Sequence, residues 1–244
     1  MGAIDIDEYL HYDNPANGDL QEVVPGKIVA LRTPVDLGGG EYRDRSDGVR
    51  DFSPAFHADI LHGMGVCAVV RLGEPRYAGA AFESRGLAHH DVDYAGGACP
   101  PDAAVAAFFQ IIAATSPRAL AVVCETGRGR AGTLTALYLM RWHKFSAREA
   151  MGWLRIMRPG SVNGEQQRYL CAVEDARRAL RARSGLPPVA VGSCTESPTE
   201  APAPAAAQDE RRSRAAGSRL AIAAQGAAAV MCRSLAGKAA PGLR

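Results

Sequence analysis

The sequence lacks an excess of charge of either sign: 28 basic and 26 acidic residues give a net charge of +2 over 244 residues. Overall charge therefore gives no support for nucleic-acid binding, which usually goes with a clear basic excess. Long hydrophobic runs are also missing, because the apolar stretches are strand-sized and interrupted by charge, so we expect no membrane segment. The acidic start MGAIDIDEYL has neither the basic region nor the apolar centre of a signal peptide, and Ile6 stands where myristoylation needs Ser or Thr.

Closely spaced cysteines are absent as well. The six cysteines are scattered, with no pair at the spacing of metal ligands and no dense disulfide framework. The adjacent His89 and His90 would face opposite sides of a strand, so they cannot chelate one ion together. We expect reduced thiols, no metal, no cofactor and a location in the cytoplasm or nucleus. The oligomeric state stays open.

Aromatic residues become scarce after about Leu186, where Pro, Ala, Ser and charged residues dominate. Such a composition cannot bury enough apolar surface to offset the entropy of ordering the chain. We therefore divide the chain into a folded domain at 1–185 and a low-complexity, largely disordered tail at 186–244. Within the tail, the Ala-rich residues 220–236 are expected to form at most a weak amphipathic helix.

Apolar runs and helical patterns alternate in residues 1–185. Runs rich in β-branched residues predict buried strands at 27–31, 66–72 and 119–124. Helical spacing, with Ser53 and Ser146 as N-caps, predicts helices at 53–65, 100–116, 133–143, 146–157 and 164–183. Strands connected by helices indicate an α/β domain with a parallel or mixed sheet covered by helices on both faces.

The segment VVCETGRGRAGT carries the chemistry. Cys124 ends a predicted strand and Arg130 follows six positions later at the entrance of a helix, with Gly127 and Gly129 between them. Glycines allow the backbone to curve so that its N–H groups surround an anion, and an arginine can donate two hydrogen bonds to phosphate oxygens. The predicted phosphate-binding residues are Glu125, Thr126, Gly127, Arg128, Gly129 and Arg130.

A thiol at a helix N-terminus beside an arginine is expected to be a thiolate near neutral pH and therefore a nucleophile. Attack on phosphorus would give a phosphocysteine that water then hydrolyses. The structural alternative is that Cys124 is an ordinary core residue at the end of a strand, which is the usual fate of a free cysteine. The strand, the two glycines and the helix around it favour the phosphate-binding loop.

This segment resembles the signature loop of cysteine-based protein tyrosine and dual-specificity phosphatases, C-x5-R with internal glycines. The likeness extends to NGDLQEVVPGKIVAL, VVRLGEPRYAGAAFESRGLAHHDV and LRIMRPGSVNGEQQRYL, and is greatest for the catalytic half of the mitotic-exit dual-specificity phosphatases. It covers residues from about 8 to 180. The family's separate N-terminal domain, which forms half of the substrate groove, has no counterpart here, so substrate choice cannot be carried over and that domain could be supplied by another chain.

The resemblance implies roles for individual residues. Cys124 would be the nucleophile, Arg130 would clamp the phosphate, and Gln166, with Gln167, would position the hydrolytic water. The partner would be a phosphorylated protein. Without the resemblance, the two glutamines would be interpreted simply as polar residues near the start of a helix.

Three departures from the family pattern put turnover in doubt. Gly96 stands where the family has its general-acid aspartate, Val123 replaces the histidine before the cysteine, and Ala131 replaces the hydroxyl residue after the arginine. General acid catalysis contributes about 10²–10⁴-fold, and its loss is worst for basic leaving groups such as a serine alkoxide. Asp93 or Asp102 could take over the acid's role if the loop moves, although a solvated loop or cap position is the simpler interpretation of each.

Two functions therefore remain. The first is a protein phosphatase that hydrolyses phosphotyrosine, and phosphoserine or phosphothreonine more slowly. The second is a degenerate phosphatase that binds phosphoproteins with little turnover. Arg148, Arg155 and Arg158 are interpreted as a solvated helix face, with a supporting role near phosphate as the lesser alternative.

Overall fold

The computed structural model describes residues 4–183, 225 and 227–231. A five-stranded sheet of order β1-β2-β7-β5-β6 lies at the centre, with β1 antiparallel to β2 and the other neighbours parallel. The strands of this sheet are β1 (Leu20–Val24), β2 (Ile28–Arg32), β5 (Val66–Arg71), β6 (Ala88–Asp91) and β7 (Ala119–Cys124). A separate hairpin pairs β3 (Tyr42–Asp44) with β4 (Arg50–Phe52).

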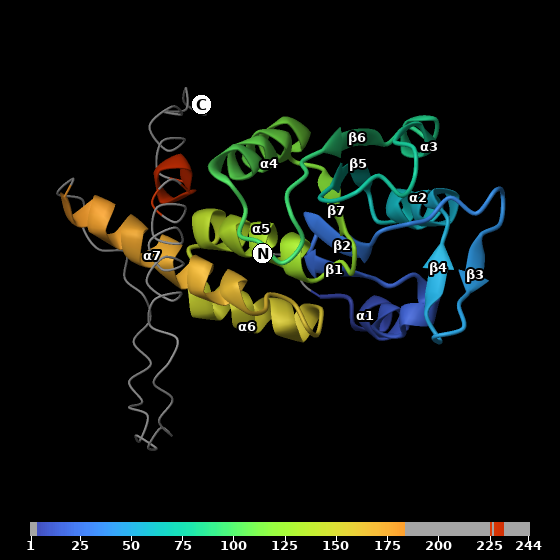
Figure 1. Ribbon diagram of the computed structural model, residues 1–244, viewed down its shortest axis with the longest axis horizontal. Helices are drawn as coiled ribbons and strands as arrows, with labels where there is room; N and C mark the ends of the chain where they lie inside the picture. Colours follow the sequence, from blue (N-terminus) through green and yellow to red (C-terminus); the bar gives the residue numbers. More distant parts are fainter. Residues whose placement is uncertain (1–3, 184–224, 226, 232–244) are drawn as a thin grey trace, which may run out of the picture.

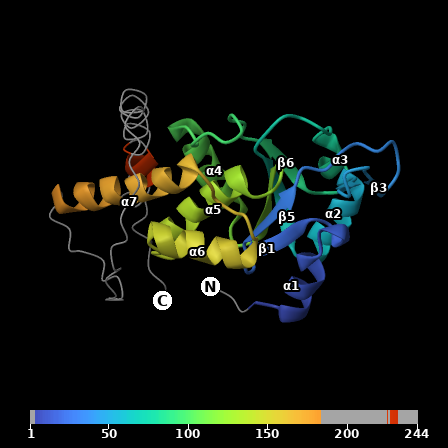
Figure 2. The ribbon, with the colours of Figure 1, turned by 60° about the horizontal axis from the view of Figure 1, so that its bottom comes forward.

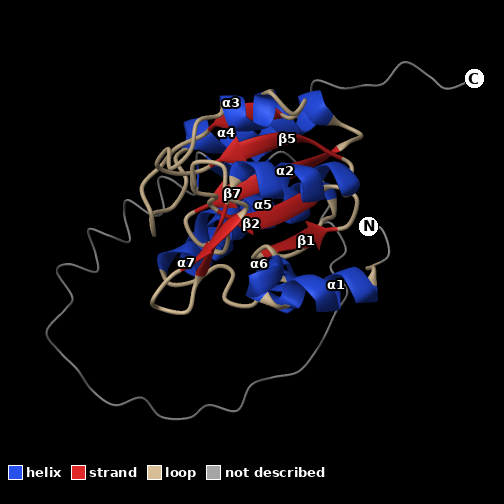
Figure 3. Ribbon diagram, turned by 90° about the vertical axis from the view of Figure 1, so that its right-hand side faces the viewer, coloured by secondary structure: helices blue, strands red, loops and turns tan. Residues whose placement is uncertain are grey.

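Helices cover both faces of this sheet, as Figures 1 and 3 show. The helical elements are α1 (Ile6–Asp13), the 3-10 helix η1 (Pro15–Asn17), α2 (Pro54–Gly63), α3 (Ala80–Glu83), α4 (Asp102–Thr115), α5 (Gly129–Trp142), α6 (Ala147–Met157) and α7 (Glu165–Arg183). The predicted α/β domain with a mixed sheet is confirmed.

Two apolar clusters hold these layers together, one on each face of the sheet. Side chains alternate along a strand, so neighbouring residues of β7 enter different clusters: Val122 and Cys124 pack with α4, α5, α6 and α7, whereas Val123 packs with α2 and α3. Every residue of β7 is buried. Full burial of a central parallel strand explains why it reads as a continuous apolar run.

The local sequence explains where α2 and α6 begin. Ser53 accepts a hydrogen bond from the Phe56 amide at the start of α2, and Ser146 and Glu149 form a reciprocal capping box at the start of α6. Helix α5 begins at Gly129, four residues before the predicted start. The sequence predicts a later start because the two glycines of the loop weaken the helical pattern there.

The predicted division at residue 185 remains a prediction, because residues 184–224, 226 and 232–244 lie outside the described part of the chain. Within the segment expected to form a weak helix, residues 225 and 227–231 are helical (Figure 1). Ala227, Ala228 and Met231 are buried in the larger apolar cluster, and the carbonyl of Val230 accepts a hydrogen bond from Arg141. This packing could not be foreseen from composition.

Figure 2 shows α6 and α7 beside α5 on the face that also carries α4. Helices α5, α6 and α7 contact one another, and α6 also contacts β1. The Trp153 indole on α6 donates a hydrogen bond to the Val23 carbonyl at 2.8 Å. This contact joins the antiparallel edge strand β1 to the layer of helices that follows the loop after β7.

A completely buried histidine predicts how stability depends on pH. His57 donates from Nε2 to the Gly18 carbonyl at 2.7 Å, while Nδ1 has no partner among the described residues, so the ring is neutral. Burial lowers the pKa of His57 from 6.5 to about 4. Between these values the unfolded chain binds the proton more readily, so the contribution of His57 to stability is complete above pH 6.5 and is lost as pH falls toward 4.

We expect urea unfolding at pH 7.5 and pH 5 to show a fall in unfolding free energy of about 2 kcal/mol attributable to this group, from 1.36 kcal/mol per pKa unit. His57→Gln, which cannot take up the proton, should have the smaller fall. An equal fall in the two proteins would contradict the prediction.

Candidate active site

The candidate site lies where β7 ends and α5 begins. Cys124 is the last residue of β7 and is buried, and Arg130 is the second residue of α5. The amides at the start of α5 have no intrahelical acceptor, and the helix dipole places partial positive charge there. The sequence-predicted loop from Glu125 to Arg130 therefore occupies a position suited to an anion.

Gly127 must be glycine for two reasons. Its φ is +68°, a conformation that side chains disfavour, and a Cβ at this position would lie 2.6 Å from the carbonyl carbon of Leu31 on β2. The Gly127 amide donates to the Cys124 carbonyl at 2.9 Å, so it closes the turn. Of the backbone amides predicted to surround an anion, that of Gly127 is therefore already bonded within the turn.

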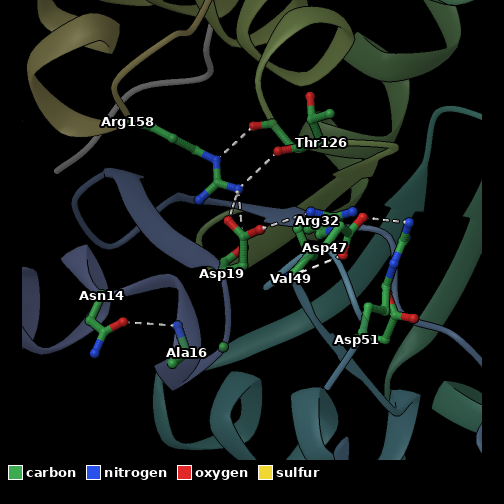
Figure 4. A network of polar contacts seen from close by, with 12 residues as sticks. Asn14, Ala16, Asp19, Arg32, Asp47, Val49, Asp51, Thr126 and Arg158 are labelled. Carbon is green, nitrogen blue, oxygen red and sulfur yellow. Dashed lines mark hydrogen bonds and ion pairs between the residues drawn. The ribbon is translucent and has the colours of Figure 1, made fainter. Parts of the chain in front are cut away.

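Arg158 holds the outer side of the loop. Its guanidinium donates to the carbonyl of Thr126 at 3.0 Å (Figure 4). It also donates to the carbonyl of Gly127 at 2.9 Å. In a planar trans peptide the N–H points opposite to the C=O, so the bond to Gly127 turns the Arg128 amide away from Arg158 and toward the inner side of the loop. Arg158 is thus a positioning residue for the loop.

The same guanidinium anchors the loop to the first strand. It donates to the carboxylate of Asp19 at 2.7 Å and to the Gln21 side chain at 2.8 Å. Arg158 is 2% exposed, so its assignment to a solvated helix face is wrong. Arg148 and Arg155 are exposed as predicted. Helical spacing suggested one face for all three, but α6 ends at Met157 and Arg158 adopts an extended backbone that turns it inward.

Arg130 joins the loop to the segment after β6. Its Nη1 donates to the Tyr94 carbonyl at 2.9 Å, and the Tyr94 hydroxyl donates to the Arg130 carbonyl at 3.2 Å. Burial is the main cause that raises the pKa of Tyr94 well above 10, so the hydroxyl stays a donor. A Cβ added to Gly73 would lie 2.9 Å from the Arg130 guanidinium, which accounts for a glycine at that position.

Gln166 lies against the same loop. A Cβ on Gly129 would be 3.2 Å from Gln166 Oε1, and Gln166 is 1% exposed at the start of α7. The structure thus brings Gln166 to the loop from a distant position in the sequence, on a different helix from Arg130. Gln167 is only half-buried.

A pocket opens in front of Arg130. Its lining comes from four segments and includes Thr33, Gly73, Glu74, Arg76, Asp93, Tyr94, Ala95, Gly96, Glu125 and Arg130. Its volume is about 410 Å³, which falls in the range of ligand sites. The buried Cys124 thiol is not part of this lining among the described residues.

The structure also shows the surroundings of the three positions that depart from the family pattern. Val123 is buried in the smaller apolar cluster, and Ala131 is buried in α5. The hydroxyl of Thr133, two positions further on, donates to the Gly129 carbonyl at 2.9 Å. Gly96 lies beside the arginine, since a Cβ there would be 4.0 Å from Arg130 Nη2.

Neither a metal site nor a membrane span is found in the described residues. No three His, Cys, Asp or Glu side chains are grouped to hold an ion, and no helix is both long and apolar enough to cross a bilayer. His89 instead accepts or donates a hydrogen bond with the Tyr77 hydroxyl at 3.1 Å.

Comparison with protein families matches residues 53–170 to the family described as "Swiss Army Knife protein, DSP-PTPase phosphatase domain". Human dual specificity protein phosphatase CDC14A is 37% identical over 168 residues, which are 69% of this chain and 27% of that protein. The tyrosine-protein phosphatase cdc-14 of Caenorhabditis elegans is 36% identical over 182 residues, 75% of this chain and 25% of that protein. The chain thus spans about a quarter of the length of these two relatives.

Solved structures share the fold. PTPMT1 in complex with PI(5)P superposes with a TM-score of 0.53 at 15% identity, covering 68% of this chain and 99% of that one. Tk-PTP in the active form gives 0.50 at 20% identity, covering 62% and 92%. These identities support the architecture alone.

Proposed function

The chain belongs to the dual-specificity protein phosphatases, and from this premise we propose that it hydrolyses phosphate monoesters on proteins through a phosphocysteine intermediate. Phosphotyrosine is the better substrate, and phosphoserine and phosphothreonine are slower. The observation that carries the proposal is the loop itself: a cysteine at the end of a buried strand and an arginine in the first turn of the next helix, with two backbone carbonyls turned outward onto Arg158.

In this proposal the phosphate lies at the N-terminus of α5 with Arg130 on two of its oxygens. The Cys124 thiolate attacks phosphorus in line with the ester oxygen, which departs toward the pocket. Gln166, packed against Gly129, then positions the water that hydrolyses the phosphocysteine. The free state of Cys67, Cys99, Cys124 and Cys171 supports a reducing compartment, the cytoplasm or nucleus.

A second function, phosphoprotein binding with little turnover, is favoured by specific observations. Gly96 offers no proton donor, and Thr133 gives its hydroxyl to a backbone carbonyl and so does not replace the one that Ala131 lacks. Against it, a binding protein needs only the amides and Arg130, whereas this chain also keeps Cys124 and Gln166 at the loop. We therefore prefer the enzyme.

Turnover of p-nitrophenyl phosphate, a phosphotyrosine peptide and a phosphoserine peptide tests the choice. We expect hydrolysis in that descending order, with inhibition by vanadate, because leaving groups of higher basicity need more help to depart. Tight binding of the peptides without release of phosphate would instead establish the binding protein. Absence of both binding and turnover would refute both functions.

A further inference from the structure

A phosphatase of this type needs a source for the proton that the leaving group takes. A phenolate has a conjugate acid with a pKa of about 10, and a serine alkoxide is far more basic, so neither departs readily without a proton. Gly96 lies beside Arg130 but carries no side chain. A side-chain donor would therefore have to be another residue at the same pocket.

The segment after β6 is held in place over that pocket. The paired hydrogen bonds between Arg130 and Tyr94, at 2.9 and 3.2 Å, fix the backbone of this segment against the first turn of α5. Tyr94 is 8% exposed and packs in the larger apolar cluster. The residue before Tyr94 is thereby positioned relative to the phosphate-binding arginine.

That residue is Asp93. Its Oδ1 lies 3.8 Å from Arg130 Nη1, and its side chain is 64% exposed, at the open side of the pocket. In-line attack from the buried Cys124 sends the ester oxygen outward, toward this side.

Other charged groups face the same pocket. Glu74 and Arg76 come from the segment after β5, and Glu125 comes from the phosphate loop. Asp102, the other carboxylate considered from the sequence, lies instead in the first turn of α4, where it complements the helix dipole. Of these carboxylates, Asp93 combines a position in the pocket with an ion pair to the phosphate-binding arginine.

On the basis of the proposed phosphatase activity, we propose that Asp93 is the proton donor to the leaving group, in place of the residue missing at position 96. As the Cys124 sulfur bonds to phosphorus and the phosphorus–oxygen ester bond breaks, the proton of the Asp93 carboxyl passes to the departing oxygen. The resulting carboxylate then takes a proton from the water that attacks the phosphocysteine. The phosphorus–sulfur bond breaks, and thiolate and inorganic phosphate are released.

The experiment compares Asp93→Asn with the unaltered protein on phenyl phosphate, which has a strongly basic leaving group, and on p-nitrophenyl phosphate, which has a weakly basic one. We expect kcat/KM for phenyl phosphate to fall about 10²-fold or more, and that for p-nitrophenyl phosphate to fall much less. Asp59→Asn, the same change at an exposed aspartate paired with Arg85 on the surface, should leave both rates unaltered. Vanadate inhibition of Asp93→Asn checks that the phosphate site is intact.

A double variant provides the rescue. Gly96 has no positive φ, and a Cβ added there would have only Arg130 within 4 Å, so the position accepts a side chain. Gly96→Asp in the Asp93→Asn background should restore phenyl phosphate turnover roughly ten-fold or more, which is part of the factor of about 10²–10⁴ that general acid catalysis contributes.

Three results would overturn the assignment while leaving the phosphatase activity established. The first is that Asp93→Asn lowers kcat/KM equally for both esters. The second is that Glu74→Gln, and not Asp93→Asn, lowers kcat/KM steeply for phenyl phosphate, and the third is that the double variant turns over phenyl phosphate no faster than Asp93→Asn. If the unaltered protein hydrolyses neither ester, the proposed function itself fails.

Discussion

Cys124→Ser should abolish turnover of every phosphate ester, with a fall in kcat on the order of 10⁵-fold or more, as for other removed nucleophiles. The serine hydroxyl is not ionised near neutral pH and so cannot replace a thiolate as the attacking group. Initial rates with p-nitrophenyl phosphate, measured on the full chain, give the comparison. Cys171→Ser provides the matched control, because Cys171 is a free thiol on α7 outside the loop, and its rates should stay close to those of the unaltered protein.

The same variant separates the two proposed functions. The amides of α5 and the Arg130 side chain are unchanged by Cys124→Ser, so the variant should still bind a phosphotyrosine peptide, which calorimetry can measure. Activity that survives in Cys124→Ser would show that Cys124 is not the nucleophile. Loss of peptide binding together with turnover, in a variant that melts like the unaltered protein, would place the thiol in recognition instead.

Gly127→Ala should unfold the loop and destabilise the domain by roughly 2–5 kcal/mol, the sum of the cost of a left-handed alanine and of overpacking. The added methyl group would lie 2.6 Å from the backbone of Leu31, which belongs to the central sheet and cannot move freely. The measurements are the midpoint of thermal unfolding and kcat/KM for p-nitrophenyl phosphate. Both should fall.

Gly26→Ala is the matched control. Gly26 has the same φ of +68°, but a Cβ added there would meet no heavy atom within 4 Å. The unfolding free energy of Gly26→Ala should therefore fall only by the cost of a left-handed alanine, about 1–2 kcal/mol. The folded variant should keep its activity. If the two variants are equally stable, contact with β2 does not explain the glycine at position 127.

Strands and helices with strong local patterns were predictable. The run ALAVVC predicts β7 with its observed ends because a central parallel strand is buried on both faces, and Ser146 predicts the start of α6 because it caps the helix. The hairpin of β3 and β4 was missed, since Tyr42 to Asp44 is exposed and has no apolar alternation. Strand β1 was also missed, because its pairing with β2 depends on a turn at Gly26 and on packing against Trp153.

The candidate site was predictable only in part. Spacing alone brought Cys124, Arg130 and the two glycines together, because all lie within one strand–loop–helix unit. Arg158 could not be placed, since its partners Asp19 and Thr126 are 139 and 32 residues away in the sequence. The ion pair of Asp93 with Arg130 likewise depends on how the segment after β6 folds over the loop.

Because of the contacts of Arg158, a peptide of the loop alone would not adopt the conformation of the candidate site. The Arg158 guanidinium ties residues near both ends of the domain to the loop, and truncating it would leave the buried carboxylate of Asp19 without its closest partner. Arg158 and Asp19 are 139 residues apart in the sequence. Bringing them together costs conformational entropy, which is offset only when the layers between them have packed. Under the proposed function, binding of an oxyanion at the loop is therefore expected to stabilise the whole domain, and to protect β1 as well as the loop against unfolding.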